Sequence, residues 1–433
     1  MTTTKFNLSG KVLRKADMFE FGPATLTLAA GCTVDKLTPE QAFENLRAAF
    51  PVMLADFPEL RLRFATVEGA PHWAFSQDSE LEFDKLVRLF TEPDTSLPVA
   101  LPLEERPLWR VHVFPDAGCA GVKVFVSHGF CDGRTLFDIL TLFAFFAREG
   151  AAPKSPLPEA FAGRSMKGKE DRVLESLPLA KEDWFAPDVV STLKGTPASW
   201  KRVVECALTP AVELPSHSVP TQWTFEYRPV VDFCKKHGVS IQGLAGAVEA
   251  HAMWTFSGSD VKEIAVFTPT DMRRSPFSAE AIKKGTFFAH AGFVLSFVPH
   301  RDTLLEEILG SAESLRAAVS TPEAAQVVLF QSGSPRAAEG EITPLPDCGR
   351  NSIVYASHIG RICGVEGLRN PSFAISNPVW SEKGYWPSLY VFHSNDVINF
   401  TFVHPHNVSE NFVNAVRDAV KEAMDLAGAA QIN

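Results

Sequence analysis

One stretch, residues 121–146, constrains the fold and the chemistry of this chain more than any other. Val122, Val124 and Val126 alternate with other side chains, which is the period-two pattern of a β-strand rich in β-branched residues. Residues 136–146 are almost all apolar, and this predicts a helix that is buried on every side. A strand followed so closely by a buried helix would hold the residues of the intervening turn rigidly.

The turn between this predicted strand and helix reads His-Gly-Phe-Cys-Asp-Gly over residues 128–133. Because the ordinary pKa of an imidazole lies near 6.5, His128 can accept a proton at neutral pH and is a candidate general base. Asp132 could cap the following helix or pair with an arginine. Gly133 would allow close packing or an unusual backbone angle. Taken alone the pattern is short, and a loop histidine beside a helix-capping aspartate explains it at least as well.

Length and composition indicate a large globular protein. The chain has 433 residues, enough for about two to three domains. Its net charge of -10 argues against nucleic acid as a main partner, because phosphate binding needs a basic face. The seven cysteines are scattered and form no C-x-x-C pair, so neither a disulfide framework nor a zinc site is expected.

Targeting signals and metal-binding patterns are also absent from the sequence. The N-terminus lacks the apolar core of a signal peptide, and no apolar run reaches membrane-spanning length. We therefore expect a cytoplasmic protein. His404 and His406 are the only histidines whose spacing suggests a metal site, and a turn at a strand end explains them better. No metal is expected.

Both halves of the chain mix predicted strands with covering helices. Thr38 is a good N-cap and Gln41 can close a capping box, so a helix should run from there through Leu54. Proline and charge increase over residues 150–220, and the periodicity weakens, as in a crossover between domains. Further strands are predicted at 24–30, 60–64, 106–114, 222–227, 263–267, 291–298, 352–356, 385–392 and 397–403. Further helices are predicted at 229–237, 240–254, 303–319 and after Ser409.

Five places along the chain form a recognisable series: 46–50 with 58–64, 107–110, 128–133, 270–274 with 292–293, and 376–378. In this order and at about these separations, they resemble the chloramphenicol acetyltransferase-like superfamily of CoA-dependent acyltransferases. That group includes plant BAHD acyltransferases, alcohol acetyltransferases, polyketide-associated acyltransferases and the condensation domains of peptide synthetases. The resemblance covers most of the chain.

The resemblance implies an α/β (α+β) fold with two similar domains, each a mixed β-sheet flanked by helices, and a tunnel between them. The domains would span residues 1–185 and 221–433, with 186–220 as a crossover linker. Acyl-CoA would enter from one side as co-substrate and an alcohol or amine acceptor from the other. His128 would deprotonate the acceptor, which attacks the thioester without an acyl-enzyme. No bound cofactor is expected, and a monomer suffices.

Supporting roles follow from the same resemblance. Asp132 would be mainly structural and would pair with an arginine of the second half. Arg273, in a motif with Asp271, is the matching candidate; a solvated loop pair of Arg273 and Arg274 is the less favoured alternative. The candidate donors to the oxyanion are Ser376, Asn377 and Trp380; a simple turn explains the first two equally well. The candidate CoA-phosphate ligands are Lys283 and Lys284, for which a solvated helix face is the more ordinary reading.

Departures from the superfamily patterns decide between its branches. The D-F-G-W-G motif of BAHD enzymes is missing from residues 377–386. Condensation domains usually carry a second histidine where this chain has Ser127, and no carrier domain is expected to follow. Gly292-Phe293 lacks an expected asparagine. A free-standing enzyme that uses acyl-CoA is therefore favoured. A carrier-bound acyl donor and a catalytically silent binding relative stay open as alternatives.

Overall fold

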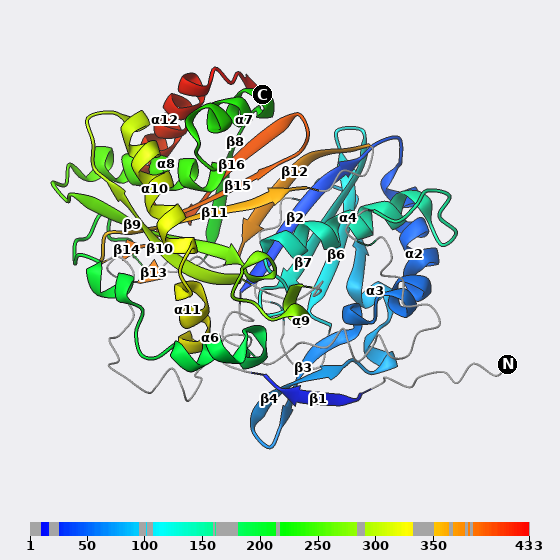
Figure 1. Cartoon of the computed structure of the whole chain (residues 1–433). Coiled ribbons are helices and arrows are strands. Elements are labelled where there is room, and N and C mark those ends of the chain that lie inside the picture. Colours follow the sequence, from blue (N-terminus) through cyan, green and yellow to red (C-terminus); the bar gives the residue numbers. More distant parts are fainter. Residues whose placement is uncertain are drawn as a thin grey trace. The chain divides into compact units, whose positions relative to one another are not determined.

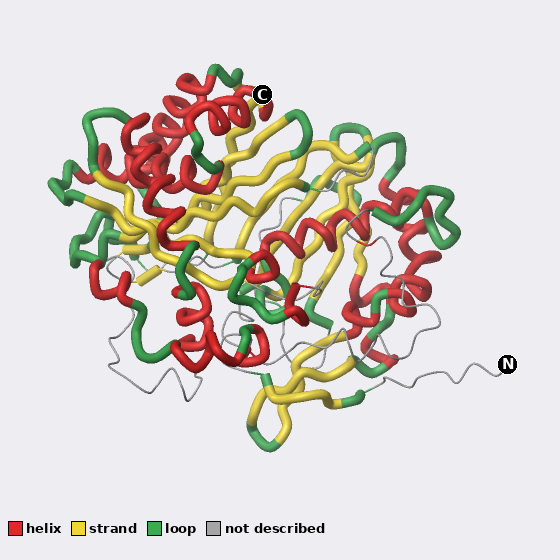
Figure 2. The backbone as a smooth tube through the Cα atoms, in the orientation of Figure 1, coloured by secondary structure: helices red, strands yellow, loops and turns green. Residues whose placement is uncertain are grey.

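A computed structural model of the chain gives the arrangement of its helices and strands (Figure 1). The structure describes residues 10–16, 26–94, 101, 107–158, 161, 181–213, 217–283, 291–331, 350–362, 367–376, 380–381 and 384–432. The chain forms two compact units. The first contains residues 1–180, 284–289 and 363–376, and the second contains 181–283, 290–362 and 377–433. Each combines a β-sheet with helices (Figure 2), as the sequence predicts.

The first unit is built on a five-stranded sheet with the strand order β12-β2-β7-β6-β5. Its strands are Leu368–Ile375 (β12), Thr27–Val34 (β2), Cys119–Ser127 (β7), Trp109–Asp116 (β6) and Val87–Leu89 (β5). Strands β6 and β7 form the hairpin that the sequence predicts, and its turn places Ala117 and Gly118 at positive φ. The long helices are Pro39–Asp56 (α2) and Gly133–Glu149 (α4).

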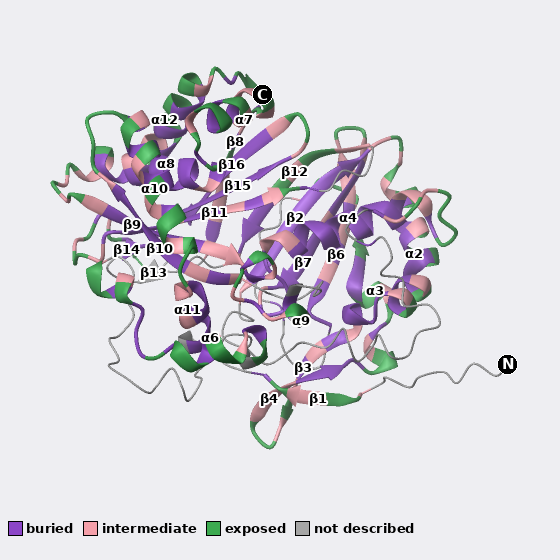
Figure 3. Cartoon of the chain, viewed as in Figure 1, coloured by how far each residue is buried: buried purple, intermediate pink, exposed green. Residues whose placement is uncertain are grey.

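Helix α4 packs against β2, β7 and α2 and is the core of this unit. Every residue from Thr135 to Ala147 is buried, so the predicted all-round burial is confirmed (Figure 3). Trp109 of β6 packs against Phe143 of α4 with ring centroids 5.0 Å apart. Thr38 and Gln41 form the predicted capping box at the start of α2.

Smaller elements complete the first unit. A separate three-stranded sheet has the order β1-β4-β3. Its strands are Val12–Lys15 (β1), Ala70–Phe75 (β4) and Leu62–Val67 (β3), and the short helices are Pro58–Arg61 (η2), Asp78–Glu80 (η3) and Phe83–Leu86 (α3).

The second unit is built on a seven-stranded sheet with the order β10-β9-β11-β15-β16-β8-β17. The strands are Ala291–Pro299 (β10), Glu263–Asp271 (β9), Ile353–Arg361 (β11), Ser388–His393 (β15), Val397–Pro405 (β16), Ser218–Glu226 (β8) and Gln431–Ile432 (β17). Strand β11 runs parallel to both β9 and β15, and the other pairs are antiparallel. The sheet is therefore mixed, as predicted.

Helix α8 (Ile241–Ser257) is the centre of this unit's core and contacts α10, α12 and the strands β11 and β15. The other helices are Tyr227–His237 (α7), Leu304–Val319 (α10), Glu323–Gln331 (α11) and Glu410–Ala427 (α12), with the short Lys181–Trp184 (η5), Pro187–Thr192 (α6), Ala198–Arg202 (η6), Met272–Arg274 (η7) and Glu280–Lys283 (α9). Trp380–Ser381 (β13) and Gly384–Tyr385 (β14) form a small ribbon. Among the described residues, no helix is both long enough and apolar enough to cross a membrane.

Two features of the fold are absent from the sequence prediction. Residues 368–375 form the edge strand β12 beside β2, so a segment from the C-terminal half belongs to the first unit. Residues 187–202, placed in the predicted linker, belong to the second unit, where Trp200 is part of the hydrophobic core.

Candidate functional site

His128 lies immediately after β7, at the end of the central strand pair of the first unit. Thr27 and Ser127 are opposite each other in the β2–β7 ladder, and the backbone N–H of His128 donates to the carbonyl of Leu26 at 2.8 Å. After Gly129, the backbone N–H groups of Phe130 and Cys131 both donate to the carbonyl of Ser127. The turn is therefore tied back to the strand on which it begins.

A single hydrogen bond fixes the tautomer of the His128 ring. Its Nδ1 lies 2.9 Å from the carbonyl oxygen of Cys131. A carbonyl oxygen can only accept, so Nδ1 carries the proton and donates it. In the neutral ring the lone pair is then on Nε2. Within the described part of the chain Nε2 has no hydrogen-bond partner, and the side chain as a whole is only half-buried.

The surroundings of His128 keep its ring neutral. Removal from water lowers the pKa of His128 below its ordinary 6.5, and this effect outweighs the opposing effects of the Cys131 carbonyl and the Asp132 charge. Desolvation acts in this direction because it penalises the charged imidazolium. At neutral pH the residue therefore holds an unprotonated nitrogen on an immobilised ring, which is the form that a general base requires.

Asp132 is the N-cap of α4. Its Oδ1 accepts a hydrogen bond from the backbone N–H of Thr135 at 2.8 Å, and the side chain is buried. Of the two local roles expected for this residue, capping is present. Gly133 is the first helical residue, and its φ is not positive. The unusual backbone angle considered for it is therefore wrong, because this position is ordinary helix.

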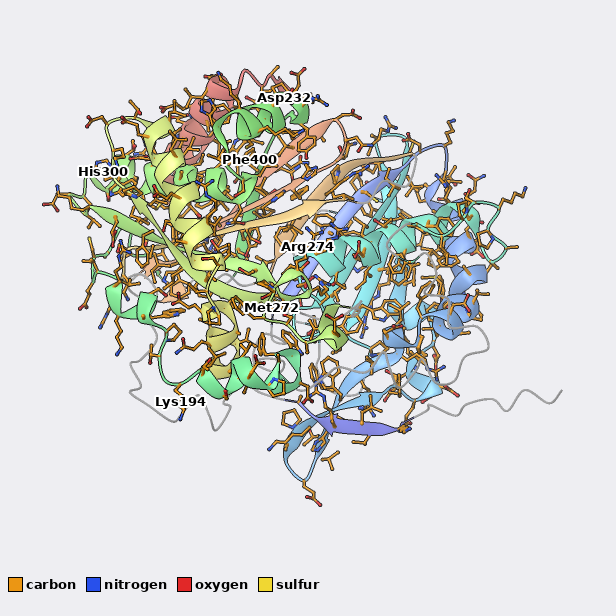
Figure 4. All side chains as sticks on the ribbon, viewed as in Figure 1. Lys194, Asp232, Met272, Arg274, His300 and Phe400 are labelled. Carbon is orange, nitrogen blue, oxygen red and sulfur yellow. The ribbon has the colours of Figure 1, made fainter. Side chains whose placement is uncertain are left out.

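Arg273 and Asp271 lie together in the second unit, in the turn that follows β9. The Nε of Arg273 donates to Oδ1 of Asp271 at 2.7 Å, and the same oxygen accepts from the backbone N–H of Arg273 at 3.1 Å. Arg274, labelled with Met272 in Figure 4, has its Nε 3.7 Å from the other oxygen of this carboxylate. The motif therefore forms a compact ion-paired turn. The pairing of Arg273 with Asp132 stays a prediction.

Ser376 follows β12 and lies in the first unit with His128. Its Oγ accepts a hydrogen bond from the backbone N–H of Thr27 at 2.8 Å, and its own N–H donates to the carbonyl of Thr27, also at 2.8 Å. Thr27 directly follows Leu26, which binds the backbone of His128. One strand end thus holds both residues, although 248 positions separate them in the sequence (376 less 128).

The remaining predicted residues are only partly described. Asn377 and Lys284 lie outside the described residues. Trp380 is in β13 and Lys283 ends α9, and only their backbones are described. No group of three or more metal-binding side chains is arranged to hold a metal ion in the part of the chain that the structure covers.

Sequence reasoning missed Leu26 and Thr27, because both bind His128 or Ser376 through backbone groups that leave no side-chain pattern. It also missed two buried ionisable residues of the second unit. Glu249 of α8 is fully buried, and burial raises its pKa well above 4.5. Burial lowers the pKa of His358 in β11 to about 3. A charged residue within an apolar helix, as Glu249 is within α8, could have been noticed.

Comparisons with known proteins add evidence on the fold. No protein-family model and no curated protein matches this chain. Among solved structures, the chain resembles the first condensation domain of the calcium-dependent antibiotic synthetase in complex with a substrate analogue, with 14% identity over 99% of this chain and 100% of that one and a TM-score of 0.63. It also resembles the starter condensation domain of rhizomide synthetase RzmA in complex with C8-CoA, with 11% identity over 97% and 95% of the chains and a TM-score of 0.60.

An acetyltransferase shows the same likeness. The TRI3 trichothecene 15-O-acetyltransferase from Fusarium sporotrichioides is 14% identical, with 96% of this chain and 95% of that one covered and a TM-score of 0.59. At such identities the likeness concerns the fold, and it extends over nearly the whole length of each chain.

Proposed function

We propose that this chain, which has the fold of condensation domains and chloramphenicol acetyltransferase-like enzymes, is an acyltransferase with His128 as its general base. One observation carries the proposal: the Nδ1 of His128 donates to the Cys131 carbonyl, and among the described residues Nε2 has no hydrogen-bond partner, on a half-buried ring whose pKa is lowered by removal from water.

The reaction that fits this site is direct transfer of an acyl group from a thioester to an alcohol or amine. The O–H or N–H bond of the acceptor breaks as its proton moves to Nε2 of His128, and the acceptor atom bonds to the thioester carbonyl carbon. When the tetrahedral intermediate collapses, the C–S bond breaks. The proton then passes from Nε2 to the leaving thiolate, and the ring returns to its neutral form.

Ser376 is the residue we propose as donor to the oxyanion of this intermediate. Its Oγ already accepts from Thr27 N–H, so its own O–H proton is available to donate. The side chain is half-buried, which leaves it accessible. Asn377 and Trp380 stay proposed as further donors, Lys283 and Lys284 as ligands of the CoA phosphates, and Arg273 as a partner of Asp132.

Acyl-CoA is the donor we favour. The absence of a second histidine before His128, where Ser127 stands, distinguishes the chain from the usual condensation-domain pattern, and one structural neighbour carries C8-CoA in its complex. A second candidate is a carrier-bound donor, which the likeness to condensation domains favours at a TM-score of 0.63.

The test is to incubate the purified protein with acetyl-CoA or longer acyl-CoA and a panel of alcohols and amines while thiol release is followed. His128→Ala should lower turnover by roughly 10²–10⁴-fold, the usual contribution of a general base. His72→Ala is a matched control, because the Nδ1 of His72 also bonds a backbone carbonyl, at 3.0 Å, but on β4. It should leave turnover unchanged.

Activity with carrier-loaded acyl groups alone would select the second candidate. A His128→Ala variant as active as the original protein would refute the assignment of the base.

A further inference from the structure

Leu26, just before β2, and Thr27, the first residue of β2, bind the two residues that the proposed reaction uses, His128 and Ser376. Leu26 accepts the backbone hydrogen bond of His128 through its carbonyl, and Thr27 exchanges two hydrogen bonds with Ser376, each 2.8 Å long. The base and the proposed oxyanion donor are therefore attached to consecutive residues of one strand. Their separation depends on how firmly this strand end is held.

The sheet geometry sets the distance between the two segments. Strand β2 lies between β12 and β7, and neighbouring strands are about 4.8 Å apart. Ser376, Thr27 and Ser127 continue one row across the three strands, so the backbones of Ser376 and Ser127 are roughly 10 Å apart. The backbone of Thr27 therefore joins the segment that ends in Ser376 to the strand that leads into His128.

The side chain of Thr27 fixes this strand end from a third direction. Thr27 is fully buried, and its Oγ1 accepts a hydrogen bond from the backbone N–H of Leu101 at 3.1 Å. Leu101 is also buried. Because Leu101 is buried, removal of the Thr27 hydroxyl would leave its N–H without this acceptor and would destabilise the contact with the strand end.

We infer that Thr27 is a positioning residue for acyl transfer, which acts by holding Ser376 in place through its contacts with Ser376 and Leu101. This inference rests on the proposed function. Thr27 does not touch the reacting atoms. It acts on the turnover rate because catalytic groups must lie within a few tenths of an ångström of their productive positions.

Two substitutions separate the hydroxyl from the shape of the side chain. Thr27→Val keeps the branched shape and removes the acceptor for Leu101, and Thr27→Ser keeps the acceptor. We expect Thr27→Val to lower kcat roughly tenfold with KM changed by less than about twofold, and Thr27→Ser to stay within about twofold of the original kcat. An unchanged kcat in a folded Thr27→Val protein would overturn the inference.

A double substitution tests whether Thr27 works through Ser376. If it does, Thr27→Val combined with Ser376→Ala should be little slower than Ser376→Ala alone, because the residue that Thr27 positions is already gone. A merely structural role would instead multiply the two losses. Multiplied losses would therefore count against the inference.

Amide hydrogen exchange tests the same contact without any assay of activity. The Thr27 N–H, bound to Ser376 Oγ, should be protected in the original protein and should exchange at least about tenfold faster in Ser376→Ala. Equal exchange in both proteins would show that the contact is not made. Protection together with no acyl transfer by the original protein would refute the proposed function while leaving the contact in place.

Discussion

Replacement of His358 by phenylalanine is expected to make the protein more resistant to acid. His358 lies on β11, with its ring stacked on that of His393 at a centroid distance of 5.5 Å and its backbone N–H donating to Gln242 Oε1 at 2.6 Å. Its Nε2 is buried without a hydrogen-bond partner among the described residues. The pKa of His358 is lowered to about 3, chiefly by burial and in smaller part by the charges of His393 and Arg274.

The size of the effect follows from the difference in proton binding between the folded and unfolded chain. In the unfolded chain the pKa of this imidazole is the ordinary 6.5, whereas in the folded chain it is about 3. At pH 5 the unfolded chain therefore gains a proton that the folded chain does not. Over the 1.5 pH units between 6.5 and 5, this lowers the free energy of unfolding by about 2 kcal/mol. At pH 8 both states are neutral and the effect vanishes.

The assay is denaturant unfolding of the original protein and of His358→Phe at pH 8, 6 and 5 and at constant ionic strength. The other histidines are common to both proteins, so their contributions cancel in the difference. The free energy of unfolding of the variant, relative to the original, should increase by about 2 kcal/mol from pH 8 to pH 5. Leu309→Ala, at an exposed position of α10, should leave the pH dependence unchanged. Parallel curves for His358→Phe and the original protein would refute the reasoning.

Three further substitutions test other parts of the structure. Burial raises the pKa of Glu249 well above 4.5, so the folded chain keeps a proton that the unfolded chain loses above pH 4.5. Glu249→Gln should therefore gain stability relative to the original protein, by up to about 1.4 kcal/mol for each pH unit above that value. A constant difference in the free energy of unfolding from pH 5 to 7, measured by denaturant unfolding, would contradict this. Asp132→Ala removes the N-cap of α4 and should lower the free energy of unfolding by about 1 kcal/mol in thermal unfolding, whereas Asp132→Asn should lower it much less. Equal losses of stability in the two variants would argue against capping. At Gly292 an added Cβ would lie 2.5 Å from Met272 Sδ and 3.1 Å from the Ala324 carbonyl oxygen. Gly292→Ala should therefore destabilise the protein by about 1–3 kcal/mol in the same assay. An unaltered melting temperature would show that these neighbours move aside at little cost.

Local structure could be predicted well because its causes lie close together in the sequence. The capping box of Thr38 and Gln41, the strand that ends at Ser127 and the buried helix after Asp132 are each determined by residues a few positions apart. Gly238, which ends α7 at φ 65°, likewise follows from the chemistry of one residue. For such elements the spacing of apolar and capping residues is sufficient information.

Strand β12 could not be predicted because its pattern is weak and its partner is remote. Of its eight residues only Phe373, Ala374 and Ile375 are buried, so no alternation marks it as a strand. It pairs with β2, where Ile375 lies opposite Leu28. Spacing in one sequence carries no information on which strand edge such a segment joins, because the choice depends on the assembled sheet.

Parts of the candidate site likewise differ in whether the sequence predicts them. The turn that carries His128 and the N-cap at Asp132 could be predicted from residues a few positions apart, whereas the catalytic role of His128 stays a prediction. The groups that orient these residues could not be predicted, since the carbonyl of Cys131 and the backbone of Leu26 and Thr27 are present in any sequence. Only the folded chain brings these backbone groups to the ring.

The most direct test of the central claim is ¹⁵N nuclear magnetic resonance of the His128 ring in histidine-labelled protein, with His128→Gln used to assign its signals. We predict that the His128 ring is neutral at pH 7, with the proton on Nδ1, an unprotonated Nε2 and a pKa below 6.5. A proton on Nε2 at pH 7, or a pKa above 6.5, would contradict it.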